Sequence, residues 1–478
     1  MDFQNKIKEC TEKIFQAAKK ADEDPIRPEY HFHSPAQWMD DPNGVIWHKG
    51  YYHMMYSLNP DTDKYRAGMV YKTGSTLWSP SEADWTGGIT VWGHARSKDL
   101  IHWEHLPVAL YPDTENSEYY IWFGCTVIND EGVPAAIYTS IGYEDRNPAD
   151  SALQFIAFGD DDLITWRQDR AVNPVMTEEL HHGEKVWEWR DPFVFRQNGK
   201  AFMILGGKED KKQGGNAAVF LYEAANKAFT KWVYKGVLFE YPDPELRSCE
   251  CPNIVNLGDK WVLFVSPYGC QVEYFAGELD AENCRFEWNN HGTVDYSTHF
   301  YATNVIEDGK GRNLLWGAVE GFQNTSGWNG VNSLPREISL NNEGKLVQKI
   351  PEELKMLRGE HYSLRGKETA VTRTGCIELC VRCEAGKTGE IRIGDTVISI
   401  GKENIIIEEN SIDRKEAEQC EMNIFLDKSM MEVFINETGC FTAMVPPVTG
   451  ECEIQLMGES FDAEIWQLNT ENLFSKYE

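Results

Sequence analysis

The sequence predicts an all-β protein: a five-bladed β-propeller followed by a C-terminal β-sandwich, with a short N-terminal helix. From about residue 25 onward, short segments of alternating apolar and polar residues follow one another, separated by turn sequences such as NG, DEG and LGD. A motif within these segments recurs about every 60 residues, which is typical of repeat architectures. After residue 365 the short strands continue without that repeat, which indicates a second domain of a different kind.

The N-terminal segment is predicted to be a helix, which we assign to residues 1–24. Between residues 3 and 21 the apolar Ile7 and Ile14 are spaced among Lys and Glu with helical periodicity, and Pro25 follows. The segment is charged throughout and lacks the apolar core of a signal peptide, and no apolar run reaches the ~18–20 residues of a membrane span. We therefore expect a cytoplasmic protein with no membrane partner.

The propeller prediction, which covers residues 25–349, depends on a repeated turn sequence. Residues 99–103 (DLIHW) recur as residues 162–166 (DLITW), and looser copies end at Trp232 and Trp288. The four tryptophans are spaced 63, 66 and 56 residues apart, so this part of the chain holds about five units. Blades of this kind close into a ring, which removes the exposed sheet edges that a single blade would leave.

Two further segments follow the propeller. Residues 350–364, which begin IPEELKML, are predicted to be a short helical linker. Residues 365–478 contain strand-like runs such as GEIRIGDTVISIG, MNIFLD and MEVFIN without a helical pattern between them. This density of short strands indicates a β-sandwich.

The composition excludes several classes of partner. The chain has 46 basic and 76 acidic side chains, a formal net charge of −30 and a pI of about 4.8. Phosphate backbones and anionic lipid surfaces bind through clustered Lys and Arg, so we expect neither nucleic acid nor a membrane as a partner. Aromatic residues make up 12% of the chain, and sugar-binding clefts use such side chains for stacking as well as for the core.

The sequence predicts no cofactor and no metal. It has no GxxxxGK[ST] phosphate loop, no HExxH zinc helix and no GxSxG nucleophile elbow. His31 and His33, which would share a strand face, lack a third ligand, as does the adjacent pair His181 and His182. We expect all four to be structural or hydrogen-bonding residues.

The twelve cysteines are expected to be reduced thiols, because the chain shows no export signal. Cys376, Cys380 and Cys383 have the C-x3-C-x2-C spacing that can hold an iron–sulfur cluster. The surrounding sequence CIELCVRCEA alternates like a β-strand, however, which would turn Cys380 and Cys383 to opposite faces of a sheet. We interpret the spacing as coincidence.

Three acidic residues stand in the same sequence context, each one or two residues before a proline and ahead of a strand, a turn and a second strand. They are Asp41, Asp191 and Glu250. We interpret them as equivalent positions at the start of the first strand of three blades. First strands line the axis of a propeller, so these side chains would converge at one mouth. Residues 122–125 (WFGC) and 300–302 (FYA) would supply the matching positions of the other two blades.

Converging carboxylates predict a particular chemistry. Negative charges held together and buried beside aromatic residues raise one another's pKa. A carboxyl that stays protonated beside one that stays ionised is the pair that glycoside hydrolysis uses. A single Asp-Pro is a common beginning of a strand, but three in register are not expected by chance. The repeat alone therefore predicts a carbohydrate-active propeller, and a calcium-containing arabinan-type enzyme also fits that pattern.

The same residues resemble those of glycoside hydrolase family 32, which contains invertases, sucrose-6-phosphate hydrolases and fructan hydrolases. Residues 38–44 (WMDDPNG) stand where the family has WMNDPNG, and the stretches beginning at Trp92 (WGHARSKDLIHW), Arg190 (RDP) and Glu250 (ECP) also match. In the last domain MEVFINETG is similar to the family as well. The resemblance covers residues 25–478 and implies the same propeller and sandwich.

By this resemblance, Asp41 would be the nucleophile that forms a fructosyl–enzyme ester. Glu250 would protonate the leaving oxygen and then activate water, and Asp191 would hold the fructose hydroxyls and stabilise the transition state. This is a retaining double displacement, for which the carboxyls of Asp41 and Glu250 lie about 5–5.5 Å apart. Arg190 would keep Asp191 ionised. The other implied substrate-binding residues are Trp38, Asp40, Asn43, Ser57, Trp122 and Phe123. No metal or organic cofactor is implied.

The sequence departs from the family pattern at four places. Asp40 replaces the family's Asn beside the nucleophile, and Ser57 replaces a Gln that contacts the sugar. Residues 61–88 form an insertion rich in Gly, Ser and Trp, and long loops at a propeller mouth usually restrict or extend the substrate site. His299 stands where relatives often carry a second Asp. These changes leave the three carboxylates in place and are compatible with an unusual fructoside as substrate.

The leading hypothesis is a retaining β-fructofuranosidase that hydrolyses a terminal fructosyl residue from a small fructoside: sucrose, sucrose 6-phosphate or a fructo-oligosaccharide. A fructosyltransferase would use the same intermediate but pass it to a sugar, so that less fructose than glucose is released. A non-catalytic sugar-binding propeller is a third hypothesis, which conflicts with the complete set of Asp41, Asp191 and Glu250.

Overall fold

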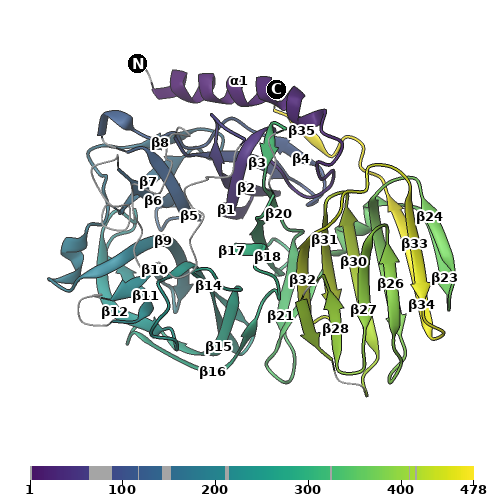
Figure 1. Ribbon diagram of the computed structural model, residues 1–478. Coiled ribbons are helices and arrows are strands. Elements are labelled where there is room, and N and C mark those ends of the chain that lie inside the picture. Colours follow the sequence, from purple (N-terminus) through teal and green to yellow (C-terminus); the bar gives the residue numbers. More distant parts are fainter. Residues whose placement is uncertain are drawn as a thin grey trace.

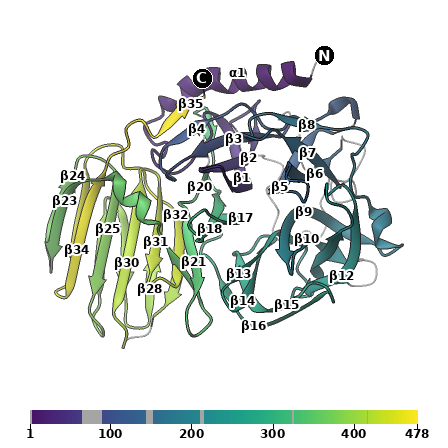
Figure 2. The same cartoon turned by 180° about the vertical axis from the view of Figure 1, so that it is seen from behind.

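The computed structural model describes residues 3–63, 89–116, 118–142, 152–209, 215–322, 326–408, 410–414 and 417–477. The chain forms a ring of five β-sheets beside a two-sheet sandwich, and helix α1 (Phe3–Asp22) lies across the outside of the ring (Figure 1). The view from behind shows the same arrangement (Figure 2). The predicted fold class is confirmed. Within the described residues, no helix combines the length and the apolar character needed to cross a membrane.

The ring is a propeller whose blades are antiparallel sheets, taken in chain order. Blade I consists of β1 (Gln37–His48), β2 (Tyr51–Asn59), β3 (Val91–Ser97) and β4 (Trp103–His105), and blade II of β5 (Tyr120–Ile128), β6 (Pro134–Ile141), β7 (Leu153–Gly159) and β8 (Trp166–Gln168). Blade III consists of β9 (Val186–Gln197), β10 (Lys200–Glu209), β11 (Ala217–Ala224) and β12 (Trp232–Glu240), and blade IV of β13 (Cys249–Leu257), β14 (Lys260–Pro267), β15 (Glu273–Asp280) and β16 (Arg285–Thr293). Blade V consists of β17 (Phe300–Glu307), β18 (Asn313–Val319), β21 (Arg336–Leu340) and β22 (Leu346–Lys349), with β20 (Val331–Asn332) paired to β18.

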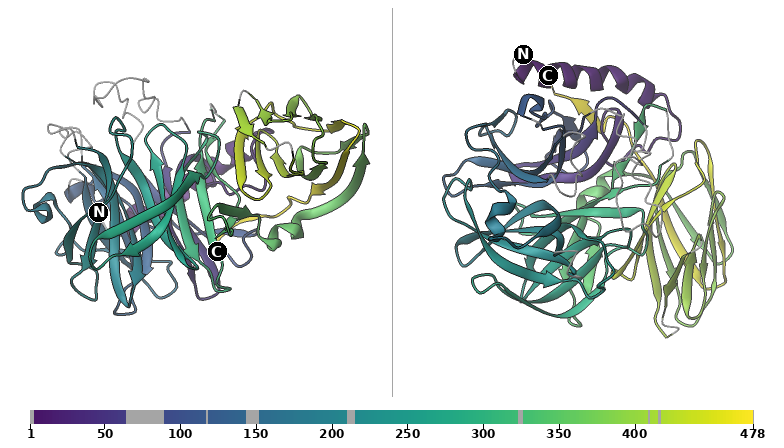
Figure 3. Two further views of the ribbon diagram at one scale, coloured as in Figure 1. Left: turned by 90° about the horizontal axis from the view of Figure 1, so that it is seen from below. Right: turned by 60° about the vertical axis from the view of Figure 1, so that its left-hand side comes forward.

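The first strands of the blades meet around the axis. Each of β1, β5, β9 and β13 contacts the first strand of the next blade, and β17 contacts β1 to complete the circle. The closure is reinforced by β19 (Trp328–Asn329), which lies between β18 and β21 in the chain and pairs in parallel with β1 of blade I. Seen from below, the sandwich lies against the side of this ring (Figure 3). Side chains on the first strands are therefore brought together from five separate parts of the sequence.

The repeated turn sequence leads into the outer strand of a blade. Leu100, Leu163 and Phe229 have φ values of 68°, 61° and 61° at the same point of the turn in blades I, II and III. Three residues later in each blade, a tryptophan donates its indole N–H to the carbonyl of that residue, at 3.2, 2.9 and 2.9 Å. The tryptophan recurs in the sequence because it satisfies a buried carbonyl and fills the space beneath the same turn.

Helix α1 covers the outer side of blade I. Its periodic apolar residues Ile7, Cys10 and Ile14 are buried there, as the spacing predicts. Ala21, near the end of the helix, packs with Trp328 of β19. The helix is therefore an outer layer of the propeller.

The sandwich is built from two six-stranded sheets. One has the order β23-β34-β25-β30-β31-β32, with β23 (Arg358–Arg365), β34 (Phe461–Leu468), β25 (Cys376–Cys383), β30 (Cys420–Asp427), β31 (Met430–Ile435) and β32 (Gly439–Met444). The other has the order β24-β33-β26-β27-β28-β29, with β24 (Thr369–Thr372), β33 (Cys452–Met457), β26 (Gly389–Ile393), β27 (Thr396–Ile400), β28 (Asn404–Ile407) and β29 (Asn410–Asp413). Within the predicted linker range, the structure has a 3-10 helix at Glu352–Leu357, and β23 begins directly after it.

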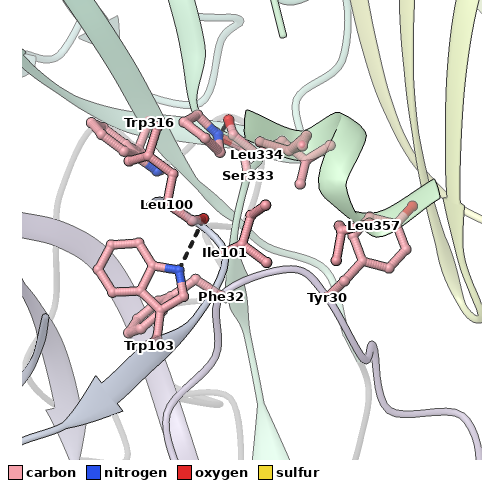
Figure 4. Close-up of a pocket in the computed structure, with 11 residues that line it drawn as sticks. Tyr30, Phe32, Leu100, Ile101, Trp103, Trp316, Ser333, Leu334 and Leu357 are labelled. Atoms are coloured by element: carbon pink, nitrogen blue, oxygen red, sulfur yellow. Dashed lines mark hydrogen bonds between the residues drawn. The ribbon is translucent and has the colours of Figure 1, made fainter. Parts of the chain in front are cut away.

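The propeller and the sandwich share an apolar boundary. Tyr30, Ile101 and Leu334 pack there in one buried cluster with Phe425 and Phe434 of the sandwich. On the propeller side, Tyr30, Ile101, Leu334 and Leu357 line a cavity of about 10 Å³, which has room for about one water molecule (Figure 4). The two domains are also joined by β35 (Phe474–Lys476), which follows the last sandwich strand and pairs in parallel with β4 of blade I.

A buried ionic network lies beside this apolar boundary. His31 is fully buried, with Nδ1 2.9 Å from Asp427 Oδ2 and Nε2 3.1 Å from Glu432 Oε1, both on the sandwich. Glu432 also accepts a hydrogen bond from Arg336 of blade V, at 2.7 Å. The hydrogen bonds to the two carboxylates raise the pKa of His31 to about 9 against the opposing effect of burial. His31 precedes β1, so the interpretation that His31 and His33 share a strand face is wrong, although both are hydrogen-bonded as expected.

We expect this network to make domain docking sensitive to pH. Because the pKa of His31 is higher in the folded protein than its usual value of about 6.5, its contribution to stability is complete below that value and disappears as the pH rises through about 9. The free energy of unfolding should fall by about 3 kcal/mol over this interval. Urea denaturation at pH 6.5 and pH 9 measures the difference, which His31→Gln should remove. His361→Gln is the matched control, because His361 forms an exposed pair with Glu464 and should change little.

Candidate active site

Each of the five first strands carries a β-bulge at the same place. In each, two residues oppose one residue of the second strand, and these pairs are residues 40–41, 122–123, 191–192, 251–252 and 302–303. A bulge bends a strand and re-aims its side chains. Asp191, Cys251 and Ala302 each begin a bulge, with φ values of 68°, 45° and 48°, a conformation that residues other than glycine rarely adopt.

The bulges show that the three acids do not occupy the equivalent strand positions that the sequence predicts. Asp41 is the second residue of its bulge, Asp191 is the first, and Glu250 immediately precedes its bulge. The three positions are therefore staggered by one residue from blade to blade, and the interpretation that they are equivalent is wrong. The acid–proline pattern hides this stagger, because the prolines themselves are not at equivalent positions. Pro42 follows a bulge, whereas Pro192 and Pro252 lie within one.

The three carboxylates nevertheless come together. The Cys251 thiol is fully buried, and its pKa is raised well above the usual value, first by burial and then by Asp191, Asp41 and Glu250 in that order. Asp191 Oδ2 lies 3.7 Å from this thiol. Acids from blades I, III and IV therefore lie near one thiol at the axis of the propeller.

Glu250 is held by hydrogen bonds to both carboxylate oxygens. Tyr301, on β17 of blade V, donates its hydroxyl to Oε2 at 2.6 Å, and Arg190 donates from Nη2 to Oε1. The Tyr301 hydroxyl also lies 3.1 Å from the carbonyl of Ser266. The carboxyl of Glu250 is therefore fixed between blade III and blade V.

Asp191 is buried beside Glu250. Its Oδ2 accepts a hydrogen bond from the backbone N–H of Cys251 at 2.9 Å, and its own N–H donates to Thr139 Oγ1 at 2.8 Å. Burial raises the pKa of Asp191 to about 6; the charge of Arg190 opposes this change, and that of Glu250 adds to it. Arg190 approaches Asp191 only to 3.7 Å and hydrogen-bonds to other acids. Arg190 therefore lowers the pKa of Asp191, as expected, but by less than burial raises it.

Replacing Asp191 by Asn should stabilise the protein at neutral pH while removing activity. A carboxyl whose pKa is raised from its usual 3.8 to about 6 costs the folded state about 3 kcal/mol when it is ionised. This cost is absent below pH 3.8 and reaches its full size above pH 6. Thermal unfolding of Asp191→Asn should therefore show a higher Tm than wild type at pH 7.5 and no such gain at pH 4. An equal gain at both pH values would contradict the assignment.

Asp41 has two further acids nearby. Carboxylate oxygens of Asp40, Asp41 and Glu320 lie within 4.8 Å of one another, a spacing that a cation could bridge. Glu320 follows β18 of blade V, and its carbonyl lies 2.8 Å from Nδ1 of His299. His299 therefore contacts the backbone of Glu320, and the Glu320 carboxylate lies close to those of Asp40 and Asp41.

Apolar and aromatic side chains complete the site. Phe123, Cys251 and Ala302, from blades II, IV and V, form one buried cluster at the axis. The guanidinium of Arg190 lies 5.8 Å from the centre of the Trp122 ring. Trp38 is buried on β1, three residues before Asp41.

Asn43 and Ser57 lie on β1 and β2, the first two strands of blade I. Both are buried, and the Asn43 amide is 2.9 Å from the Ser57 hydroxyl. With its side-chain oxygen facing Ser57, Asn43 also accepts hydrogen bonds from the Ser57 backbone N–H at 3.0 Å and from the Trp92 indole N–H at 3.3 Å. The structure therefore pairs these two candidate substrate-binding residues with each other. Residues 64–88, most of the predicted insertion, lie outside the described residues.

The cysteine and histidine patterns have structural explanations. Cys383 packs in the sandwich core with Leu379 and Val381, whereas the Cys380 thiol lies 3.3 Å from Asn423 Oδ1 on the other face of β25. The predicted separation of these thiols is confirmed. All twelve cysteines are free. His181 forms a 2.7 Å hydrogen bond with the hydroxyl of Tyr222.

Several residues at the site have no signal in the sequence. Thr139 and Glu320 adjoin the acids but belong to no motif, and Glu188 contacts Arg190. Tyr301 lies within the matching stretch 300–302, but nothing in the sequence shows its hydrogen bond to Glu250.

Comparison with known proteins decides the family. The chain matches the description "Glycosyl hydrolases family 32 N-terminal domain" over residues 31–76 and 75–350. The chain belongs to glycoside hydrolase family 32. As a family 32 chain it is a glycoside hydrolase.

Related proteins extend over most of this family 32 chain. It is 26% identical to a sucrose-6-phosphate hydrolase of Escherichia coli, covering 92% of this chain and 94% of the relative. It is 31% identical to a levanase of Bacillus subtilis, over 71% of this chain and 48% of the levanase. A solved family 32 β-fructofuranosidase of Bombyx mori superposes with a TM-score of 0.80 at 25% identity, covering 98% of this chain and 99% of the other.

Proposed function

We propose that the protein is a retaining β-fructofuranosidase that releases a terminal fructosyl residue from a small fructoside. The observation that carries the proposal is the convergence of Asp41, Asp191 and Glu250 on the buried Cys251 thiol, from three different blades. Relatives named sucrose-6-phosphate hydrolase and β-fructofuranosidase support fructose as the recognised sugar. The family does not by itself choose among fructosides.

Each of the three acids has surroundings that suit one role. Asp41 would attack the anomeric carbon and form an ester, and carboxylate oxygens of Asp40 and Glu320 lie within 4.8 Å of its own. Glu250 would protonate the leaving oxygen and later take a proton from water. Asp191, whose pKa is about 6, would be ionised at neutral pH and would accept hydrogen bonds from two fructose hydroxyls.

The substrate-binding residues follow from the same arrangement. Trp38, Trp122 and Phe123 would form apolar walls of the fructose pocket, and Arg190 would link Glu250 to the wall at Trp122. Asn43 and Ser57 would act by fixing the first strand of blade I behind Asp41. Asp40 would contact the sugar beside the nucleophile.

We propose a cytoplasmic location and a small substrate. Twelve free thiols, nine of which lie on the described strands, are in keeping with a reducing compartment. A polymeric fructan does not enter a cell, so sucrose, sucrose 6-phosphate and short fructo-oligosaccharides are the candidates.

The decisive experiment is incubation of the purified chain with sucrose, sucrose 6-phosphate, inulobiose, levanbiose and kestose, with quantification of free fructose and glucose. Equal release of fructose and glucose from sucrose would establish hydrolysis, and fructose in deficit would establish transfer to a sugar. No release from any substrate, or equal release by Asp41→Asn, would refute the proposal.

A further inference from the structure

Glu188 is a buried acid for which the proposed reaction has no direct use. It lies on β9, two residues before Arg190, and its φ of 54° is one that residues other than glycine rarely adopt. Its side chain is 12% exposed. A carboxylate in such a position is held there by its partners, because a buried charge without partners is costly.

The partners of Glu188 are two arginines. Oε2 accepts a hydrogen bond from Arg190 Nη1 at 2.6 Å. Oε1 accepts two from Arg247, at 3.0 Å from Nε and 2.7 Å from Nη2. Because the other end of the Arg190 guanidinium donates to Glu250, the four side chains form a row of alternating charge: Arg247, Glu188, Arg190 and Glu250.

We propose that Glu188 is a positioning residue that controls how strongly Arg190 favours the ionised form of Glu250, and so sets the pH range in which Glu250 can donate a proton. The inference depends on the proposed role of Glu250 as general acid. Glu188 does not contact the reacting atoms in this account; it acts through Arg190.

The physical reason is that Arg190 is shared. A guanidinium beside a carboxylate favours its ionised form, and it does so less when a second carboxylate lies on its other side. Despite burial, Arg190 and Arg247 lower the pKa of Glu188, so Glu188 is ionised at neutral pH. Other groups that face this row include Asp191, 3.7 Å from Arg190 Nε, and Tyr301 on Glu250. The ring of Tyr268 lies 4.5 Å from the Arg247 guanidinium, and the thiols of Cys249 and Cys251 are close to Glu250.

Two substitutions in this row should act in opposite directions. Glu188→Gln removes a negative charge, so Arg190 favours ionised Glu250 more strongly, and the alkaline limb of the pH–activity profile should move about one pH unit lower. Arg247→Gln removes a positive charge on the far side of Glu188, so that limb should move higher. Glu188→Asp keeps the charge and should restore the limb towards the wild-type position.

The test is the pH dependence of kcat/KM for fructose release from sucrose between pH 4 and 9, for the full chain and each variant. Opposite shifts support the proposal. A uniform loss of rate with unmoved alkaline limbs, or shifts of both limbs in the same direction, would overturn the proposal. Damage to the fold would not depend on whether the substitution removes a positive or a negative charge. If Glu188→Gln does not fold by circular dichroism, Arg247→Gln decides the question alone, since this side chain is 18% exposed.

The outcome for the wild type separates the two proposals. A wild-type protein that releases no fructose from any of the five substrates refutes the proposed function and with it this inference. If the wild type is active and the variants keep its alkaline limb, the role of Glu188 is refuted and the proposed function is not. An activated substrate, p-nitrophenyl β-D-fructofuranoside, adds a further check: it needs little protonation of its leaving group, so the limb shifts should shrink with it.

Discussion

Asp41→Asn is expected to reduce fructose release by roughly 10⁴- to 10⁶-fold while leaving the fold intact. The amide has nearly the shape of the carboxylate but cannot attack an anomeric carbon, so no fructosyl ester forms. We expect Asp40 not to replace it, because Asp40 is attached one residue earlier on the strand, as the first residue of the bulge in which Asp41 is the second. The measurement is the initial rate with the preferred substrate of the panel.

Two controls accompany this prediction. Asp40→Asn restores the residue that the family usually has beside the nucleophile, and it should retain turnover within about tenfold of the wild type. Circular dichroism and thermal unfolding should be the same for both variants and the wild type. Turnover of Asp41→Asn at more than about one hundredth of the wild-type rate would show that another residue is the nucleophile.

Glu250→Gln is expected to slow sucrose hydrolysis by about 10²- to 10⁴-fold and to slow p-nitrophenyl β-D-fructofuranoside much less in its first step. The amide cannot protonate the leaving oxygen, and glucose leaves poorly without a proton, whereas p-nitrophenolate leaves well. The amide also cannot activate water, so the fructosyl ester should accumulate. Azide needs no general base, and its addition should restore turnover of the activated substrate with fructosyl azide as product.

The contrast with Asp41→Asn makes this prediction specific. Azide should not rescue Asp41→Asn, because that variant forms no ester to intercept. Tyr301→Phe removes the hydroxyl that donates to Glu250 Oε2 but leaves the carboxyl, and should cost far less than Glu250→Gln. If sucrose and the activated substrate slowed equally in Glu250→Gln and azide had no effect, Glu250 would not be the general acid and base.

The fold could be predicted because its signals are local. In blades I to III the tryptophan of each repeated turn donates to a carbonyl three residues away, so the residues that form the turn lie together in the sequence and recur as a motif. The N-terminal helix shows its buried face in the spacing of Ile7, Cys10 and Ile14. Such contacts leave a pattern that a single sequence displays.

The register of the acids could not be predicted for the opposite reason. A bulge is defined by the residue on the neighbouring strand, and nothing in the sequence around Asp41 or Asp191 shows which of its residues is left unpaired. Glu188 and Arg247 are 59 residues apart, and Arg247 lies on the segment that connects blade III to blade IV, so their contact follows only from the folded path of the chain. The buried His31 between two sandwich carboxylates is likewise a contact across about 400 residues.

The pairing of β19 and β35 with blade I has a consequence for synthesis on the ribosome. Blade I is made before these partners: its inner strand lacks its neighbour until residues 328–329 are made, and its outer strand lacks its neighbour until residues 474–476 are made. The nascent chain must therefore carry an unfinished sheet, with Asp41 on it, until residues 474–476 have been synthesised. Chaperones that shield open strand edges should bind this nascent chain once blade I has emerged and leave it only after those residues have been made.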